Sequence, residues 1–150
     1  MKKIILCILT LGVLTLTSCS SDDDGSINIE NASVSIDNTL MDFDVAVQNI
    51  QSFRVMSFSN SSDDSKYFII TLERDEVGNE AVASVSYLTV DGTYRYDKYT
   101  VDNPATITSD IEINTSNAFK GTLSGVLSKY IEGVGYETIT VESGNFDVTF

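Results

Sequence analysis

The sequence predicts an all-β domain, built as a single antiparallel β-sandwich of about nine or ten short strands, with a lipocalin-like β-barrel as the alternative. From residue 27 onward, apolar residues recur at every second position almost everywhere, which is typical of strands buried on one face. Polar segments rich in Asp, Asn, Ser and Gly separate these stretches and predict turns. No segment combines a helical apolar period with capping residues, so helices are not expected.

The first half of the domain alternates between expected strands and turns. The expected strands are residues 27–30, 32–37, 40–48, 67–73 and 82–90. Residues 50–58 depart from simple alternation, because Phe53 and Val55 lie on one face whereas Met56 and Phe58 lie on the other. This pattern predicts a β-bulge or a strand that is buried on both faces.

The second half is expected to continue in the same way, with strands at residues 106–114, 119–127, 139–141 and 146–150. The isoleucines of residues 106–114, including Ile113, are expected to share the apolar face of their strand. Residues 126–131 are the one weak candidate for a helical turn.

Two turn signals are specific enough to test. Asp91-Gly92 lies between alternating segments and predicts a hairpin with a type I′ turn, because both central residues of that turn need positive φ. Glu142-Ser143-Gly144 predicts a further turn, in which Gly144 serves the bend and Phe146 enters the core.

The N-terminus has the build of a secretory signal. Lys2 and Lys3 precede an apolar run over residues 4–16, which is too short for a spanning helix. Leu16-Thr17-Ser18-Cys19 then resembles the lipobox of bacterial lipoproteins. The resemblance implies cleavage after residue 18 and a thioether-linked diacylglycerol, usually with an N-acyl chain, on Cys19. Two or more acyl chains make membrane anchoring stable.

A short acidic tether follows the cysteine. Residues 20–26 include Asp22, Asp23 and Asp24 and contain no apolar residue, so they are expected to span about 15 Å as a flexible linker. The segment resembles the export signal of Bacteroidetes lipoproteins, which implies display on the outer face of the outer membrane. The alternative is a plain solvated spacer. The expected organisation is a signal peptide at 1–18, a lipidated tether at 19–26 and a β-domain at 27–150.

The C-terminal third carries a second resemblance. Residues 110–114, 119–125 and 139–148 follow one another in an order that is similar to small Bacteroidetes lipoproteins with a Gly-Thr-containing strand and a final Gly-x-Phe-x-Val segment. The resemblance implies an all-β domain and no particular activity.

Charge and composition exclude several classes of function. The chain has a net charge of −13, and loss of the two leader lysines would leave seven basic residues against 22 acidic ones, or −15. Such a surface repels phosphate backbones, so no nucleic-acid partner is expected. The chain has no histidine, which excludes Ser-His-Asp and Cys-His nucleophilic systems and histidine metal sites. No Gly-rich phosphate loop is present.

Carboxylates are the remaining candidates for chemistry. Asp42 and Asp44 share one strand face, as do Asp110 and Glu112, and such pairs can serve glycosidases. The polar face of an amphipathic strand explains them more simply. Asp63 and Asp64 lie in a Ser/Asn-rich segment that could offer oxygen ligands to calcium, without EF-hand spacing. We therefore assign no catalytic residue, no metal site and no cofactor beyond the lipid on Cys19.

Tyr94 and Tyr96 share a strand face and are a candidate ligand-binding surface, since tyrosines stack on sugars and anchor partner proteins. Cross-strand pairing explains them equally well. The leading hypothesis is a lipid-anchored, surface-displayed binding module that is not an enzyme, with a glycan or envelope protein as partner. The alternatives are an accessory lipoprotein of an outer-membrane complex and, last, a carboxylate-dependent enzyme acting on glycans.

Overall fold

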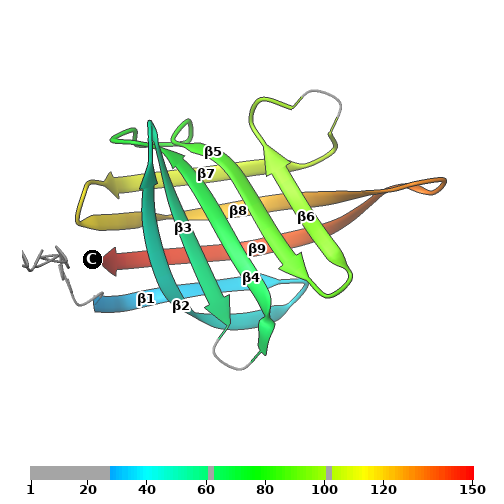
Figure 1. The fold of residues 1–150 in the computed structure, drawn as a ribbon, viewed down its shortest axis with the longest axis horizontal. Coiled ribbons are helices and arrows are strands. Elements are labelled where there is room, and N and C mark those ends of the chain that lie inside the picture. Colours follow the sequence, from blue (N-terminus) through cyan, green and yellow to red (C-terminus); the bar gives the residue numbers. More distant parts are fainter. Residues whose placement is uncertain (1–27, 61–62, 101–102) are drawn as a thin grey trace, which may run out of the picture.

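The structure, a computed structural model, describes residues 28–60, 63–100 and 103–150. These residues form nine antiparallel strands and no helix, which confirms the predicted all-β class (Figure 1). The strands are β1 (Asn28–Ile36), β2 (Thr39–Ile50), β3 (Phe53–Asn60), β4 (Asp63–Glu73), β5 (Val82–Thr89), β6 (Gly92–Asp97), β7 (Thr106–Asn114), β8 (Ala118–Ile131) and β9 (Gly135–Thr149). The described residues accordingly contain no helix of the length and hydropathy that a membrane span requires.

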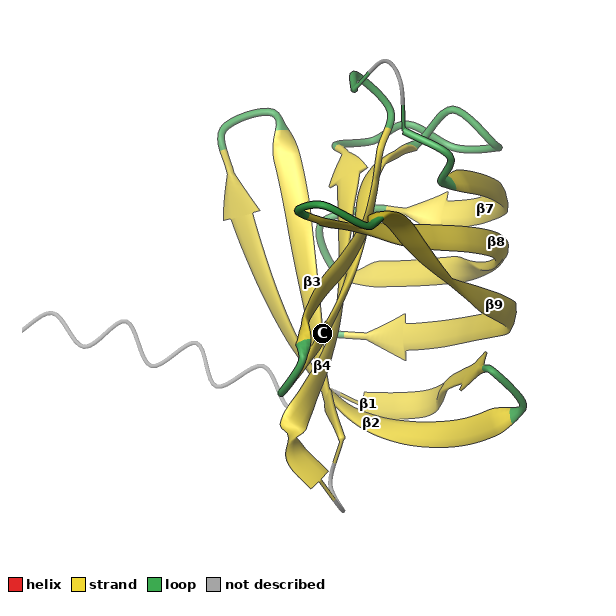
Figure 2. Ribbon diagram, turned by 90° about the vertical axis from the view of Figure 1, so that its right-hand side faces the viewer, coloured by secondary structure: helices red, strands yellow, loops and turns green. Residues whose placement is uncertain are grey.

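All nine strands belong to one sheet, in the order β6-β5-β4-β3-β2-β1-β9-β8-β7. The sheet curls so that β2–β6 cross over β1, β7, β8 and β9 at a steep angle (Figure 1), and the two halves face each other when seen from the side (Figure 2). The two layers expected of a sandwich are therefore halves of a single sheet, a feature shared with the barrel alternative.

β2 is the strand that carries the sheet from one half to the other. Its first residues pair with β1, through Thr39–Asp42, and its remaining residues pair with β3, through Phe43–Ile50. At the other side the curl is closed by a single pairing of β6 with β8, between Arg95 and Ser128. The structure thus joins distant segments of the chain with few backbone contacts at this seam.

The core fills the space between the two halves. Phe146 of β9 packs against Phe58 of β3, with ring centroids 5.0 Å apart, and against Phe119 of β8 at 5.6 Å. All three side chains are nearly or fully buried. Leu123 and Leu127 share the inner face with Phe119, as predicted. Because rings from both halves meet here, the aromatic contacts hold the curled sheet together.

The hairpin predicted at Asp91-Gly92 is present, but its turn differs from the prediction. A hairpin does connect β5 and β6, but its turn residues are Val90 and Asp91, and neither has positive φ. The hairpin with two positive-φ residues joins β1 and β2, where Asp37 and Asn38 have φ of 46° and 63°. The type I′ prediction was therefore wrong for the β5–β6 hairpin, and its backbone geometry occurs at an Asp-Asn pair instead.

The turn predicted at residues 142–144 and the helical turn predicted at residues 126–131 were wrong. Both segments are strand, in β9 and β8 respectively. Gly144 faces the ring of Phe146, and a Cβ there would lie 2.9 Å from two ring atoms. The glycine is therefore required to make room for the ring rather than to bend the chain. Phe146 itself enters the core as predicted.

Two predictions about strand faces also failed. The break at residues 50–58 arises from a hairpin turn at Gln51 and Ser52, after which Arg54, Met56 and Phe58 all point inward without a bulge between them. In β7 the bulge lies between Ile111 and Ile113, so Ile111 is buried while Ile113 is exposed.

Candidate functional site

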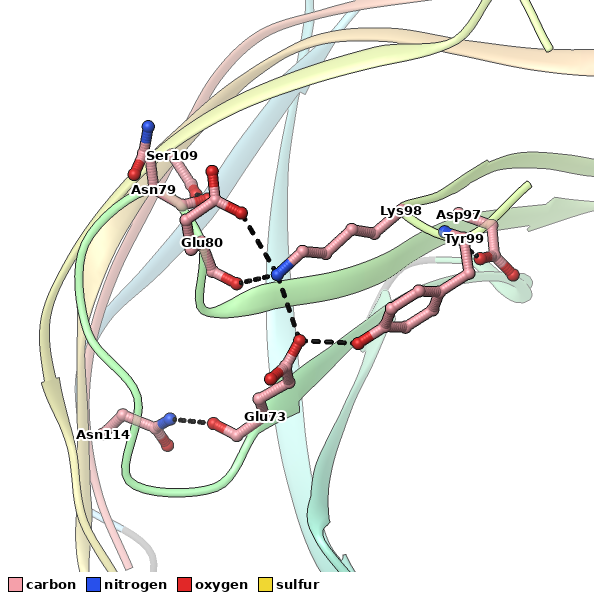
Figure 3. A network of polar contacts seen from close by, with 8 residues as sticks. All are labelled: Glu73, Asn79, Glu80, Asp97, Lys98, Tyr99, Ser109 and Asn114. Carbon is pink, nitrogen blue, oxygen red and sulfur yellow. Dashed lines mark hydrogen bonds and ion pairs between the residues drawn. The ribbon is translucent and has the colours of Figure 1, made fainter. Parts of the chain in front are cut away.

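The densest polar network ties the end of β4 to the segment after β6 (Figure 3). The Lys98 ammonium lies 3.1 Å from Glu73 Oε1 and 3.2 Å from Glu80 Oε2, and it donates to the Glu80 carbonyl at 2.7 Å. The Tyr99 hydroxyl donates to the same Glu73 oxygen at 2.7 Å. The network fastens residues 74–81 to the edge of the domain.

The same loop is fastened to β7 from the other side. Buried Asn114 donates from its amide to the carbonyls of Glu73 and Glu76, at 2.8 and 2.9 Å. The amide of Gly78 donates to Ile111 O at 2.8 Å. The outer edge of β7 is therefore covered by this loop instead of being open to another strand.

The pKa shifts in this network favour a structural role. The pKa of Glu73 is lowered, mainly by the hydrogen bond from Tyr99 and then by that from Lys98. The pKa of Lys98 and that of Tyr99 are both raised, in each case chiefly by the hydrogen bond to Glu73. Each group is held in the protonation state that it has at neutral pH, whereas a general acid or base needs a pKa near the working pH.

A second ionic cluster joins the β8–β9 hairpin to β6. Lys129 Nζ lies 2.9 Å from Glu137 Oε2, 3.2 Å from Tyr94 Oη and 4.5 Å from the centroid of the Tyr94 ring. The hydrogen bond to Glu137 is the main cause of a raised Lys129 pKa, and the same contact lowers the pKa of Glu137. This cluster, like the first, clamps two elements together.

Tyr94 and Tyr96 do share a face, but that face points into the domain. Tyr94 is 8% exposed and belongs to the core cluster, and Tyr96 is packed against that cluster. The Tyr94 ring is further covered by Lys129. The expectation that these two rings form a ligand-binding surface is corrected, because burial in the core takes up the ring faces that a ligand would use.

The carboxylates of β7 are exposed and do not converge on one site. Two shallow grooves of about 180 and 240 Å³ adjoin on the outer face of β7–β9 and share Thr122 and Asn145. Glu112 lines the first groove, where it pairs with Lys120 at 3.4 Å, while Asp110 lines the second. Asp110 and Glu112 thus share the exposed face of β7, as predicted, but line two separate grooves.

Glu142 also lines the second groove, but from β9. β8 lies between Glu142 on β9 and Asp110 on β7. Asp110 pairs with Thr122 of β8, and Thr122 pairs with Asn145 of β9, so Asn145 is level with Asp110. Glu142 lies three residues before Asn145 along β9. From strand spacing and rise, the Cα atoms of Glu142 and Asp110 lie roughly 14 Å apart, so the two carboxylates project from backbone positions that are not neighbours. The two carboxylate oxygens of Glu142 also accept hydrogen bonds from the Ser35 hydroxyl and from the backbone amide of Asn38.

The other carboxylate candidates are occupied or lie outside the described residues. Asp63 accepts hydrogen bonds from the Ser65 amide and hydroxyl and pairs with Lys66 at 3.0 Å, and the Ser65 hydroxyl is the main cause of its lowered pKa. Asp44 is exposed, whereas nothing is described of the side chains of Asp42 and Asp64. Within the described part of the chain, no cluster of three potential metal ligands occurs.

One buried charge was not anticipated. Arg54 is fully buried beside β7, where it donates to Asn49 Oδ1 at 3.3 Å and to Asn114 Oδ1 and lies 5.8 Å from the centroid of the Phe150 ring. Its Nη2 atom has no partner among the described residues, and burial lowers the pKa of the guanidinium. The sequence signal was an arginine in phase with Met56 and Phe58.

The most exposed aromatic cluster was not predicted from the sequence either. Tyr130 and Tyr136 pair across the end of the β8–β9 hairpin, with ring centroids 5.4 Å apart and planes at 66°. Val134, in the turn between them, is 82% exposed, and the two tyrosines are 65% and 50% exposed. The helical turn expected at residues 126–131 is incompatible with a pairing of Tyr130 and Tyr136. The sequence signal for that pairing is two tyrosines on either side of the turn segment Glu132-Gly133-Val134-Gly135.

The residues assigned to targeting lie outside the described residues. They are Leu16, Thr17, Ser18, Cys19, Asp22, Asp23 and Asp24. The structure begins with Asn28 in β1, one residue after the predicted start of the domain. No protein-family model matches the chain, and no curated protein matches it.

Proposed function

We propose that the chain is a lipid-anchored interaction module, displayed on the outer face of the outer membrane, that binds a partner and catalyses no reaction. The anchor is proposed from Cys19 and the lipobox-like residues before it, and the surface address from Asp22, Asp23 and Asp24. With two or more acyl chains, the attachment would be stable without basic residues, which this acidic chain lacks near its N-terminal tether.

The structural observation that carries the proposal is that the two ionic clusters, around Lys98 and around Lys129, hold elements of the fold together. Lys98 with Glu73, and Lys129 with Tyr94, each join segments that are distant in the sequence, while Glu137 pairs with Lys129 across their own hairpin. The pKa of Glu73 and that of Glu137 are lowered and those of Lys98 and Lys129 are raised, so each group stays charged at neutral pH. Such groups stabilise a rigid body and supply no general acid or base. A rigid all-β body attached to a membrane by a lipid is suited to presenting a surface to a partner.

The experiment compares three forms of the full chain in the producing cells. The native form is expected in the membrane fraction and cleaved by protease added to intact cells. A Cys19→Ser variant is expected to leave the membrane fraction. A triple variant with Asp22→Asn, Asp23→Asn and Asp24→Asn is expected to stay membrane-bound while becoming protected from protease. Membrane retention of Cys19→Ser would contradict the anchor, and unchanged cleavage of the triple variant would contradict the address.

A further inference from the structure

The end of the β8–β9 hairpin, residues 130–136, stands clear of the rest of the domain (Figure 1). Among the described residues, Lys129 at the base of this end donates hydrogen bonds to Tyr94 of β6 and to the carbonyl of Asp91 in the β5–β6 turn. Beyond it, a side chain added at Gly133 or Gly135 would meet no atom within 4 Å. We call residues 130–136 the hairpin tip.

The hairpin tip exposes apolar surface that the fold does not need. Tyr130, Val134 and Tyr136 are each at least half exposed, and none of them belongs to the core. The two tyrosines lie on neighbouring strands and contact each other edge to face, which holds both rings in a fixed arrangement. Rigid tyrosines that lose little entropy on binding are typical anchors of protein interfaces.

The position of the hairpin tip directs it away from the tether. β1 begins at Asn28, which pairs with Thr149, and Thr149 also pairs with Ala118 at the start of β8. The hairpin tip lies at the opposite end of β8, and the thirteen residue steps between Ala118 and Ile131 correspond to about 40 Å along the strand. The end of the domain that receives the tether and the end that carries the tyrosines are therefore far apart.

Charge decides between the classes of partner. Glu132 is exposed in the hairpin tip, Asp91 lies beside its base, and neither has an ion-pair partner among the described residues. The nearest cation, Lys129, is already paired with Glu137. An acidic rim repels a second copy of this acidic chain and an anionic lipid surface, and it attracts a basic one.

The ring geometry decides against a sugar. Planes inclined at 66° do not form one flat platform for a pyranose ring, and the exposed Val134 side chain in the adjoining turn offers no polar group to a sugar hydroxyl. We propose that the hairpin tip is a docking anchor for a protein that has an apolar pocket flanked by lysine or arginine residues. This inference rests on the proposed function, because it names the partner chemistry of the interaction module.

The contact is expected to be transient. Two tyrosines and one valine at these exposures offer a few hundred Å², below the roughly 800 Å² that each partner buries in a standard interface. The hairpin tip is thus the anchor of a small contact, strengthened by opposite charges and weakened by salt.

The test uses the full lipid-anchored chain in the producing cells, with a photo-cross-linking phenylalanine derivative in place of Tyr130 or Tyr136. Tyr67, an exposed tyrosine on β4, is the matched control position. A protein adduct is expected from both hairpin-tip positions and not from the control. The cross-linked protein is then purified and titrated with wild-type chain, with the Tyr130→Ser/Tyr136→Ser double variant and with Tyr67→Ser.

The double variant is expected to bind at least about tenfold more weakly, and Tyr67→Ser to bind like wild type, with an affinity that falls as salt rises. Equal affinity of the double variant would overturn the inference. So would tip-dependent binding to phosphatidylethanolamine/phosphatidylglycerol vesicles, to a glycan array or to the chain itself. Adducts from the control position alone would be consistent with an interaction module but would contradict the hairpin tip as its binding surface. Adducts from no position would contradict both proposals.

Discussion

Replacing Gly125 with alanine tests how closely β7 and β8 approach. Gly125 lies in β8 opposite Ile107 and has a φ of 147°. A Cβ at this position would lie 2.0 Å from the carbonyl oxygen of Thr106 and 3.0 Å from Ile107 Cα. Both obstacles are backbone atoms of the paired strand, so no side-chain rotation can relieve the contact. β7 would have to move away from β8.

The expected cost follows from two contributions. A positive φ costs a non-glycine residue about 1–2 kcal/mol, partly offset by about 0.4–1 kcal/mol from the lower entropy of the unfolded chain. Overpacking adds about 1–3 kcal/mol in a side-chain core, and a backbone obstacle places this site at the upper end of that range. We therefore expect Gly125→Ala to lower the free energy of unfolding by about 3–4 kcal/mol.

Gly133→Ala is the matched control. Gly133 has a φ of 79° but meets no atom within 4 Å, so its replacement is expected to cost only about 1 kcal/mol. Thermal unfolding followed by circular dichroism measures both variants, with roughly 4 °C of Tm expected for each kcal/mol. Gly125→Ala should then lower Tm by about 12–16 °C and Gly133→Ala by about 4 °C. Equal losses would refute the reasoning, because both glycines have positive φ but only Gly125 closely approaches the backbone of a paired strand.

Three further substitutions test the core and the polar networks. Phe146→Ala removes the ring that packs against Phe58 and Phe119. It is expected to lower the free energy of unfolding, measured by denaturant titration, by about 3–5 kcal/mol. A loss below about 1 kcal/mol would be incompatible with the burial of the ring. Asn114→Ala removes the side-chain donor to the carbonyls of Glu73 and Glu76 and the acceptor of Arg54 Nη1, so about 3 kcal/mol is expected. A neutral result would show that water replaces the amide. Glu73→Gln tests the pH dependence of stability, because the Glu73 pKa is lower in the folded chain than in the unfolded chain. As pH falls below about 4.5, the unfolded chain therefore binds more protons than the folded chain. The stabilisation by the Glu73 carboxylate, which is present above that pH, is then lost as pH falls further. The Tm difference between wild type and Glu73→Gln should therefore be present at about pH 6 and shrink toward about pH 3, and a constant difference would contradict the role of the carboxylate charge.

Local alternation was enough to predict the fold class and many inward-facing residues. Phe119, Leu123 and Leu127 lie on one face because strand geometry alone places every second side chain on the same side. The same rule failed at Ile113, where a bulge inserts one residue and reverses the faces. A bulge depends on the partner strand, which short-range pattern does not contain.

Glycines are misleading for a related reason. Gly144 reads as a turn residue in isolation, but its role is set by the ring of Phe146 in the folded protein. The seam between Arg95 and Ser128, the buried position of Arg54 and the covering of Tyr94 by Lys129 likewise depend on contacts between segments far apart in the sequence. Tyr94 and Tyr96 were attractive as a surface only because periodicity says which residues share a face and not which face is buried.

The exposed tyrosines at the β8–β9 turn differ from these long-range contacts, because their pairing depends on nearby residues only. Tyr130 and Tyr136 are brought together by hairpin register, since Ile131 pairs with Gly135 across a three-residue turn. A hairpin centred on this turn places the two tyrosines opposite each other through local register alone, so the pairing was predictable from the sequence. Their exposure, however, follows from the length by which this hairpin extends past Lys129.

The central claim, that Cys19 is converted into a lipid anchor for this acidic β-domain, is tested most directly by the intact mass of the native protein extracted from cells. We predict a chain that begins at Cys19 and carries the mass of a diacylglyceryl group, with an N-acyl chain in addition where that step occurs. A chain that retains Met1, or that begins at Cys19 with a free thiol, would contradict the claim.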